Sequence, residues 1–309
     1  MTDNFDIRAA IVKVVDGEHL SHDEMNRAMQ LIMSGECGDA QIGGFLCALR
    51  SKGETVKEVA AAAEVMRALA SGVKCQSDDL IDIVGTGGDS SSTFNISTTS
   101  ALVAAAAGLR VAKHGNRAVS SSSGAADLLE AAGVNIELDA DQVANCVNEV
   151  GLGFMFAPRH HGAMRHAIGP RKELGMRTIF NVLGPLTNPA SAQRQIMGVY
   201  SQHLVQPMAE VLGKLGSDRA MVVHGDDGMD EISNGAATHI AELKDGTVSS
   251  YTISPQDFGM EASPIDEIKV GGAQESLAMV NKVLDNTAGA ARNIVALNAG
   301  AAIYVGGKA

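Results

Sequence analysis

Residues 82–109, DIVGTGGDSSSTFNISTTSALVAAAAGL, connect a short apolar segment to an alanine-rich helix through a long loop of glycines and hydroxyl side chains. An ordinary strand-to-helix connection needs only a few residues and one N-cap. Gly85, Gly87 and Gly88 allow main-chain N–H groups to approach a ligand, and the free N–H groups of the following helix favour an anion. The stretch therefore predicts a strand, a phosphate-binding loop and a helix. A capped helix after a flexible turn is the alternative interpretation.

Short β-branched or apolar runs alternate with helical patterns from Leu80 onward. These runs are residues 80–84, 109–115, 134–138, 153–157, 194–201 and 219–225. Such alternation is typical of an α/β fold with a mostly parallel central sheet covered by helices. Ligands of these sheets bind beyond the carboxyl ends of the strands, where the unusual loops of this sequence also fall.

The chain before this region has helical patterns only. Ser21 and Glu24 stand at the spacing of a capping box, and apolar residues recur at helical intervals in GETVKEVAAAAEVMRALASG. We therefore expect a small N-terminal all-helical domain over residues 1–72, joined by part of residues 160–190. A larger α/β domain is expected over residues 73–309.

The composition indicates an acidic globular protein, because 24 Lys and Arg against 36 Asp and Glu give a formal net charge of −12. Nucleic acids and acidic membranes require a basic face, so neither is expected as a partner. The four cysteines have no CxxC spacing, and the N-terminus has no basic segment followed by an apolar run. We therefore expect reduced thiols and a cytoplasmic protein.

The end of the second expected strand carries charged residues that suit an anionic ligand. Lys113, His114 and Arg117 lie within five positions there, and four serines follow before the next helix. Positive charge and hydroxyl groups at the carboxyl end of a strand favour a phosphate site. A basic turn in solvent is the alternative.

Four acids, Asp226, Asp227, Asp230 and Glu231, follow the expected strand at residues 219–225. Carboxylates beside a phosphate would repel it unless a cation intervened, and Mg²⁺ is commonly held by one or two carboxylates plus substrate phosphates. The loop therefore predicts a magnesium site, with an acidic turn in solvent as the alternative.

Residues 159–177 contain five Lys or Arg and three His against one acid. A short helix is predicted before Gly169 and Pro170, and it would present His161 and Arg165 four residues apart. Arginine recognises carboxylates through a two-pronged contact, so an acidic substrate fits this segment. Zinc is not expected, because no Cys or further His stands at ligand spacing from the adjacent histidines.

Four segments resemble, in order, signature segments of the anthranilate phosphoribosyltransferase family. They are DIVGTGGD with TFNIST, VAKHGNR with the serines after it, RKELGMRTIFNVLGPLTNPA, and VHGDDGMDEIS, and they span nearly the whole chain. The resemblance implies an α/β domain similar to that of nucleoside phosphorylases. It also implies a homodimer that transfers the phosphoribosyl group of phosphoribosyl pyrophosphate to the amine of anthranilate, with Mg²⁺ and in tryptophan biosynthesis.

The resemblance also implies the site residues. Those for phosphoribosyl pyrophosphate are Gly85, Gly88, Asp89, Thr93, Asn95, Ile96, Ser97, Thr98, Lys113, Ser121 and Ala125. Those for anthranilate are Gly85, Asn116, His161 and Arg171, and those for two Mg²⁺ ions are Ser97, Asp230 and Glu231.

Several positions depart from the family pattern. Ser90 replaces a glycine, Ala125 replaces a serine expected to contact the phosphoribosyl group, Ser122 replaces a common lysine, and Gly162 stands where proline is frequent. Relatives continue for another helix beyond Gly307, so the resemblance implies a further helix that this sequence does not contain. None of these departures removes a charged residue that the chemistry needs.

No motif offers an activated Ser, Cys or Lys nucleophile with a base, so no covalent enzyme intermediate is expected. One alternative is a pyrimidine nucleoside phosphorylase-like enzyme, which would bind free phosphate and would not need the pair Asp230 and Glu231. Another is a non-catalytic relative that binds nucleic acid, which would require a basic surface in place of the acidic one.

Overall fold

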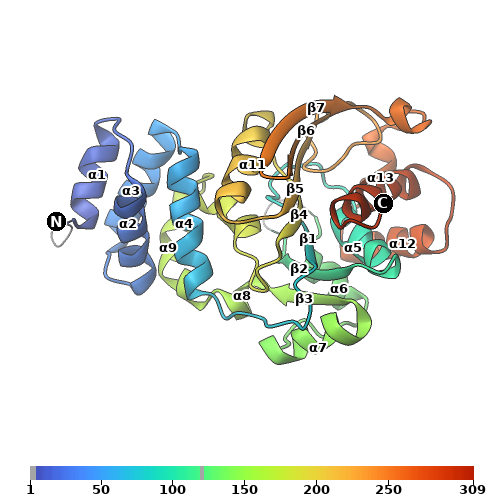
Figure 1. Ribbon diagram of the computed structural model, residues 1–309, viewed down its shortest axis with the longest axis horizontal. Helices are drawn as coiled ribbons and strands as arrows, with labels where there is room; N and C mark the ends of the chain where they lie inside the picture. The colour runs from blue at the N-terminus through green and yellow to red at the C-terminus, as the bar shows by residue number, and fades with distance from the viewer. Residues whose placement is uncertain (1–4, 119–121) are drawn as a thin grey trace. The chain divides into compact units, whose positions relative to one another are not determined.

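The computed structural model describes residues 5–118 and 122–309, and the chain divides into two compact units. The first contains the described part of Met1–Ser71 together with His161–Thr187, and the second contains Gly72–His160 and Asn188–Ala309. Figure 1 shows the first as a bundle of helices and the second as a sheet flanked by helices. No helix among the described residues is long and apolar enough to cross a membrane.

The helical unit is built from amphipathic helices around an apolar core. Its α-helices are α1 (Ile7–Val15), α2 (His22–Ser34), α3 (Asp39–Lys52), α4 (Val56–Leu69), α9 (Arg165–Leu174) and α10 (Phe180–Leu183), with 3₁₀ turns η1 (Gly162–Met164) and η2 (Gly184–Leu186). Met25, Phe45 and Leu49 are fully buried. The capping box of Ser21 and Glu24 is present, which confirms this feature of the sequence.

A buried ion pair connects the start of α4 to the rest of this unit. Glu58 accepts hydrogen bonds from Lys52 Nζ (2.9 Å), from the main-chain N–H of Leu20 (2.9 Å) and from Thr55, and the side chains of Lys52 and Glu58 are only 3% and 0% exposed. Burial alone would raise the pKa of Glu58, but these hydrogen bonds outweigh burial and lower it.

Replacing Glu58 with Ala should lower the free energy of unfolding by about 3–5 kcal/mol, because it leaves Lys52 charged and buried without its partner. Glu64→Ala on the same helix is the matched control. Glu64 pairs with His22 at 2.7 Å, but its side chain is 41% exposed, so its loss should cost about 1 kcal/mol or less. Urea unfolding followed by circular dichroism measures both changes.

The pH dependence of this difference has a definite sign. Because folding lowers the pKa of Glu58, its stabilisation is present above the ordinary value of 4.5 and is lost as the pH falls through the folded value. The gap between wild type and Glu58→Ala should therefore shrink in acid. A gap that grows as the pH falls would contradict the role of the ion pair.

The α/β unit is organised around one seven-stranded sheet in the order β3-β2-β1-β4-β5-β6-β7. The strands are β1 (Leu80–Gly85), β2 (Arg110–Gly115), β3 (Leu152–Phe156), β4 (Arg194–Gly198), β5 (Arg219–Gly225), β6 (Thr238–Lys244) and β7 (Thr247–Ile253). Strands β1 to β5 run parallel, whereas β6 and β7 are antiparallel. The predicted α/β class with a mostly parallel sheet is confirmed.

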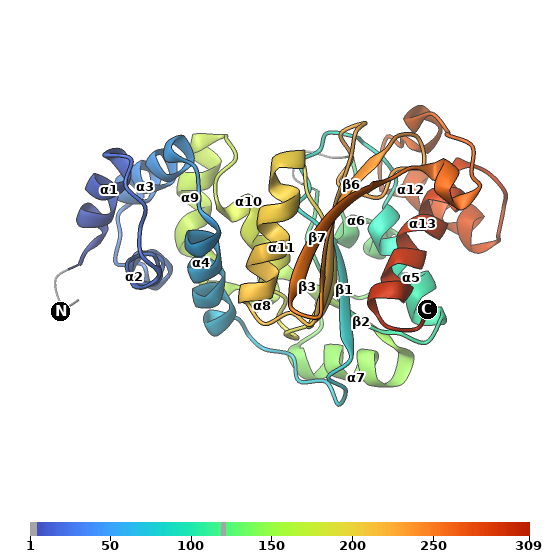
Figure 2. The same ribbon diagram turned by 45° about the horizontal axis from the view of Figure 1, so that its top comes forward.

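Helices cover both faces of the sheet. They are α5 (Ile96–Ala106), α6 (Ala125–Ala131), α7 (Ala140–Val150), α8 (Ala157–His160), α11 (Val205–Lys214), α12 (Ala273–Leu284) and α13 (Ala290–Val305), with 3₁₀ turns η3 (Gln202–Leu204), η4 (Pro255–Phe258) and η5 (Ile265–Ile268). Figure 2 shows α11 and α13 on opposite sides of the sheet. Alternate strand residues follow this division, because Ile81 and Ile83 pack with α5 and α13, whereas Leu80 packs with α7.

Two expectations about local structure are wrong. Residues 134–138 form no strand, because Asn135 Oδ1 accepts the N–H of Glu137 (3.0 Å) in a local turn and only Ile136 is fully buried. The helix expected to end before Gly169 instead begins at Arg165 and continues through Pro170 to Leu174.

Gly169 removes one obstacle to proline inside this helix. The residue before a proline is disfavoured in the helical region partly by the clash of its Cβ with the proline ring, and Gly169 has no Cβ. His161 consequently lies at the start of η1 and Arg165 at the start of α9, so the two do not lie one turn apart on one helix.

Candidate active site

The loop between β1 and helix α5 contains four residues with a left-handed backbone conformation. Gly87 and Gly88 have φ values of 64° and 77°, and Ser90 and Ser92 have φ values of 60° and 54°. Left-handed backbone costs a residue with a side chain about 1–2 kcal/mol more than glycine. Ser90 stands where the anthranilate phosphoribosyltransferase family has a glycine. It therefore adopts a left-handed conformation that costs more free energy than it would for glycine.

Asp230 lies directly against the ends of two strands. Its carboxylate accepts the main-chain N–H of Gly87 (2.8 Å). A Cβ added to Gly85 would overlap this carboxylate, and a Cβ added to Gly198 would overlap the main-chain oxygen of Asp230. The absence of side chains at the ends of β1 and β4 thus allows the acidic loop after β5 to reach the glycine loop after β1.

Glu231 faces the first turn of α5, where the main-chain N–H of Ser97 acts to lower the pKa of its carboxyl. The structure therefore brings Ser97, Asp230 and Glu231, the three expected magnesium ligands, to one place. The other two acids of the loop have structural partners: Asp226 pairs with His239 at 2.7 Å, and Asp227 accepts the hydroxyl of Ser233 at 2.6 Å.

The carboxylates in this contact are poorly compensated. Burial raises the pKa of Asp230 to about 7, and the negative charge of Asp89 adds to the rise. Burial likewise raises the pKa of Glu231 well above its ordinary value, with a further contribution from Asp230. A cation at this position would relieve both effects, so the donor set fits Mg²⁺.

These residues would supply only some of the ligands of a Mg²⁺ ion. Within residues 5–118 and 122–309, no group of three or more His, Cys, Asp or Glu side chains is arranged to hold a metal ion by itself. Mg²⁺ keeps several waters and usually completes its shell with substrate phosphates. The arrangement therefore suits an ion that is shared with an anionic substrate.

Lys113 faces the same acids from β2. Its Nζ donates to the main-chain oxygen of Ile83 and to Ser97 Oγ (3.3 Å). Burial lowers the pKa of Lys113, and the charges of Asp82, Glu231 and Asp230 oppose that change. Arg117, in contrast, pairs with Glu130 on the surface.

The other residues expected to bind phosphoribosyl pyrophosphate differ in whether their polar groups already have a hydrogen-bond partner in the protein. The Ile96 side chain lies in the core and its N–H donates to Phe94 O (2.8 Å), whereas Thr98 Oγ1 is buried without a hydrogen-bond partner in the described chain. Ala125 begins α6, and Ser121 lies outside the described residues. The main chain of Thr93 pairs with that of Lys269 in an isolated antiparallel β-bridge.

The expected anthranilate residues belong to different units. Gly85 and Asn116 are in the α/β unit, where Asn116 Oδ1 accepts the N–H of Arg117 (2.8 Å). His161 and Arg171 are in the helical unit, and His161 is buried.

Arg171 is a cation that its surroundings leave without an acidic partner. Its guanidinium lies over the ring of Phe180, 5.1 Å from the centroid, and burial lowers its pKa. Among the residues that the structure describes, no carboxylate pairs with it. A planar cation stacked on an aromatic ring is well placed to receive a carboxylate from a ligand.

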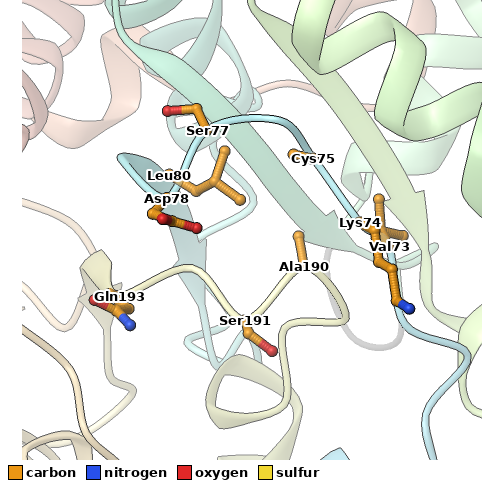
Figure 3. A pocket seen from close by; sticks show the side chains of 9 residues that line it. All are labelled: Val73, Lys74, Cys75, Ser77, Asp78, Leu80, Ala190, Ser191 and Gln193. Carbon is orange, nitrogen blue, oxygen red and sulfur yellow. The ribbon is translucent and has the colours of Figure 1, made fainter.

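The cavity in Figure 3, about 410 Å³ in volume, lies elsewhere in the α/β unit. The residues labelled there come from the segment before β1, which includes Lys74 and Asp78, from Leu80 at the start of β1, and from the segment before β4, which includes Ser191. It is therefore at the amino ends of these strands. The glycine loop and the acidic loop follow the carboxyl ends.

Comparison with known proteins places this arrangement in a family. Residues 77–309 match the model of the glycosyl transferase family, a/b domain, and residues 8–70 match the helical bundle domain of the same family. The chain is 60% identical over 300 residues to an anthranilate phosphoribosyltransferase of Thioalkalivibrio sulfidiphilus, covering 97% of this chain and 89% of that protein.

Solved structures agree. The anthranilate phosphoribosyltransferase of Thermus thermophilus superimposes with a TM-score of 0.92 at 44% identity, covering 97% of this chain and 90% of that one. The enzyme of Saccharomyces cerevisiae, solved in complex with phosphoribosyl pyrophosphate and Mg, gives a TM-score of 0.89 at 28% identity over 98% of this chain and 89% of that one.

The contact of Asp230 with the two strand ends predicts different outcomes for two similar substitutions. Gly85→Ala meets the end of a side chain that can turn away, so it should displace the carboxylate at a cost of about 1 kcal/mol or less in unfolding free energy. Gly198→Ala meets main chain, so it should cost about 1–3 kcal/mol or more. Urea unfolding ranks the two, and equal costs would contradict the described contact.

Proposed function

The chain belongs to the anthranilate phosphoribosyltransferase family, and from this premise we propose how its residues carry out the reaction. The bond between the amine nitrogen of anthranilate and the anomeric carbon forms, the bond from that carbon to pyrophosphate breaks, and the nitrogen then releases a proton. The observation that carries the proposal is the buried contact of Asp230 and Glu231 with the glycine loop and the start of α5.

Main-chain N–H groups of the glycine loop and the first turn of α5 bind the pyrophosphate of the substrate in this proposal, apart from those of Gly87, Asn95 and Ile96, which donate within the protein. Lys113 adds a positive charge next to Ser97, 3.3 Å from its hydroxyl. Mg²⁺ ions held by Ser97, Asp230 and Glu231 would neutralise the charge that develops on the leaving pyrophosphate. We propose two ions, because the two acids face different segments: Asp230 accepts the N–H of Gly87, whereas Glu231 faces the first turn of α5.

Arg171 binds the carboxylate of anthranilate in this proposal, supported by its stacking on Phe180 and the absence of an acidic partner among the described residues. The aromatic amine is already unprotonated at neutral pH, so the chain needs no strong general base. Catalysis then rests on positioning and on stabilisation of the leaving group.

We further propose that the protein is a cytoplasmic homodimer. Helix α1 exposes two apolar side chains, Val12 (61%) and Val15 (66%), which a second copy could cover. All four cysteines are free thiols, as a reducing compartment favours.

Consumption of anthranilate, followed by its fluorescence, tests the function. The purified protein should consume anthranilate only when phosphoribosyl pyrophosphate and Mg²⁺ are both present. Consumption without phosphoribosyl pyrophosphate, or none with both, would overturn the proposal.

The double variant Asp230→Asn, Glu231→Gln should fold and lose activity. The amide oxygen at position 230 can still accept the N–H of Gly87, and removing crowded negative charge should not lower stability. Titration calorimetry should show that phosphoribosyl pyrophosphate tightens Mg²⁺ binding in the wild type but not in this variant, and the coupling must be reciprocal.

Asp226→Asn is the matched control for that variant, because Asp226 belongs to the same loop but pairs with His239. It should keep both activity and Mg²⁺ coupling. If the double variant retained wild-type turnover and Mg²⁺ dependence, the two acids would have no role in binding metal.

Arg171→Ala should raise the KM for anthranilate about 10- to 150-fold, because a lost charge-assisted hydrogen bond costs about 1.5–3 kcal/mol. The KM for phosphoribosyl pyrophosphate should change little. Arg165→Ala, which removes an exposed arginine from the same helix, is the control and should leave both values near those of the wild type. Unchanged anthranilate kinetics in Arg171→Ala would rule out the role.

A further inference from the structure

Ser276 on α12 makes two hydrogen bonds to Asn95, which lies 181 positions earlier at the start of α5. Its hydroxyl donates to Asn95 Oδ1 (2.7 Å) and accepts the main-chain N–H of Asn95 (3.1 Å), and the serine is fully buried. No part of the sequence pattern marks Ser276 as close to the phosphate loop.

These bonds fix which end of the Asn95 amide points where. The main-chain oxygen of Ser123 can only accept a hydrogen bond, so Nδ2 must face it, and the opposite atom of the amide accepts the hydroxyl proton of Ser276. That atom is Oδ1, which also accepts the hydroxyl of Ser123 (2.8 Å). Asn95 Nδ2 donates to the main-chain oxygen of Ser123 (3.1 Å).

One N–H of the Asn95 amide is thus left for a ligand. An amide nitrogen carries two donor hydrogens, and Ser123 O takes one of them. The side chain makes no capping bond to its own helix, although Asn95 stands at the N-cap position of α5. Asn95 is therefore held in place by two other segments of the chain.

The segment before Ser276 holds the same loop along its length. The N–H of Phe94 donates to Ile268 O (2.9 Å), and the N–H of Val270 donates to Ser92 O (2.9 Å). The hydroxyl of Ser122 donates to Val270 O (2.8 Å). Residues 268–276 are therefore hydrogen-bonded both to the end of the glycine loop and to the serine segment before α6.

We infer that Ser276 is a positioning residue, which holds the free amide N–H of Asn95 toward the phosphoribosyl substrate. The inference rests on the proposed function, because it takes that substrate as the ligand of Asn95. Ser276 itself touches no substrate in this account. It acts through the orientation of Asn95.

The test is the dissociation constant of phosphoribosyl pyrophosphate, measured by calorimetry with Mg²⁺ present. Ser276→Ala should weaken binding about 2- to 12-fold, because an Asn95 amide that Ser276 no longer holds must be immobilised when the substrate binds. The KM for anthranilate should not change. Ser100→Ala is the matched control, since Ser100 is equally buried in α5 but its hydroxyl has no partner among the described residues, and it should bind like the wild type.

A double-mutant cycle separates positioning from general loosening of the fold. In an Asn95→Ala background, adding Ser276→Ala should weaken binding no further. If Ser276→Ala fails to fold, Ser276→Cys fills the site with a somewhat larger thiol that is only a weak donor and acceptor, and it should weaken binding in the same direction. Binding like that of Ser100→Ala, or independent effects in the cycle, would overturn the inference.

The same experiment keeps the two proposals apart. Wild-type protein that binds phosphoribosyl pyrophosphate but transfers nothing to anthranilate would overturn the proposed function and still allow the binding test of Ser276. Active wild-type protein with unaltered binding in Ser276→Ala would overturn the positioning role alone.

Discussion

The site depends on one close approach, the packing of the Asp230 main chain and carboxylate against Gly85 and Gly198 at the ends of two adjacent strands. Any side chain at Gly198 would push the acidic loop away from the sheet. With glycine at both positions, Asp230 reaches the N–H of Gly87, and Glu231 reaches the first turn of α5. The geometry of the sheet therefore brings together an anion-binding loop and two acids that would otherwise repel the same ligand.

The site has more buried negative charge than positive charge, and a cationic ligand would neutralise the excess. Burial and then the charge of Asp89 raise the pKa of Asp230, and burial and then the charge of Asp230 raise the pKa of Glu231. Lys113, the buried cation that faces these acids, is also shared with Asp82. Burying unpaired charge is costly, so the folded protein favours any species that supplies positive charge to the acids. A magnesium complex of a polyphosphate supplies cations to the acids and phosphate oxygens to the loop N–H groups at once.

Local signals predicted much of this structure. The glycine loop, the parallel strands and the capping box of Ser21 follow from periodicity and residue type, and the structure confirms them. The hairpin of β6 and β7 was missed although Asp245 and Gly246, with φ values of 51° and 72°, form the turn that such a dipeptide favours. The roles of Arg171 and of the magnesium ligands stay predictions, because they concern ligands.

Contacts between segments that are distant in the chain could not be predicted from the sequence, for a physical reason. Asn95 looks like an ordinary N-cap residue, because short-range patterns describe a side chain and its own helix. Its amide is instead oriented by Ser123 and Ser276, and the packing of α12 against α6 places Ser276 within reach of it. A polar side chain whose acceptor is already saturated by its own protein has a fixed donor direction, and a fixed donor loses less entropy on binding than a rotating one. Long-range packing therefore determines the ligand-binding capacity of a residue that local patterns identify only by type.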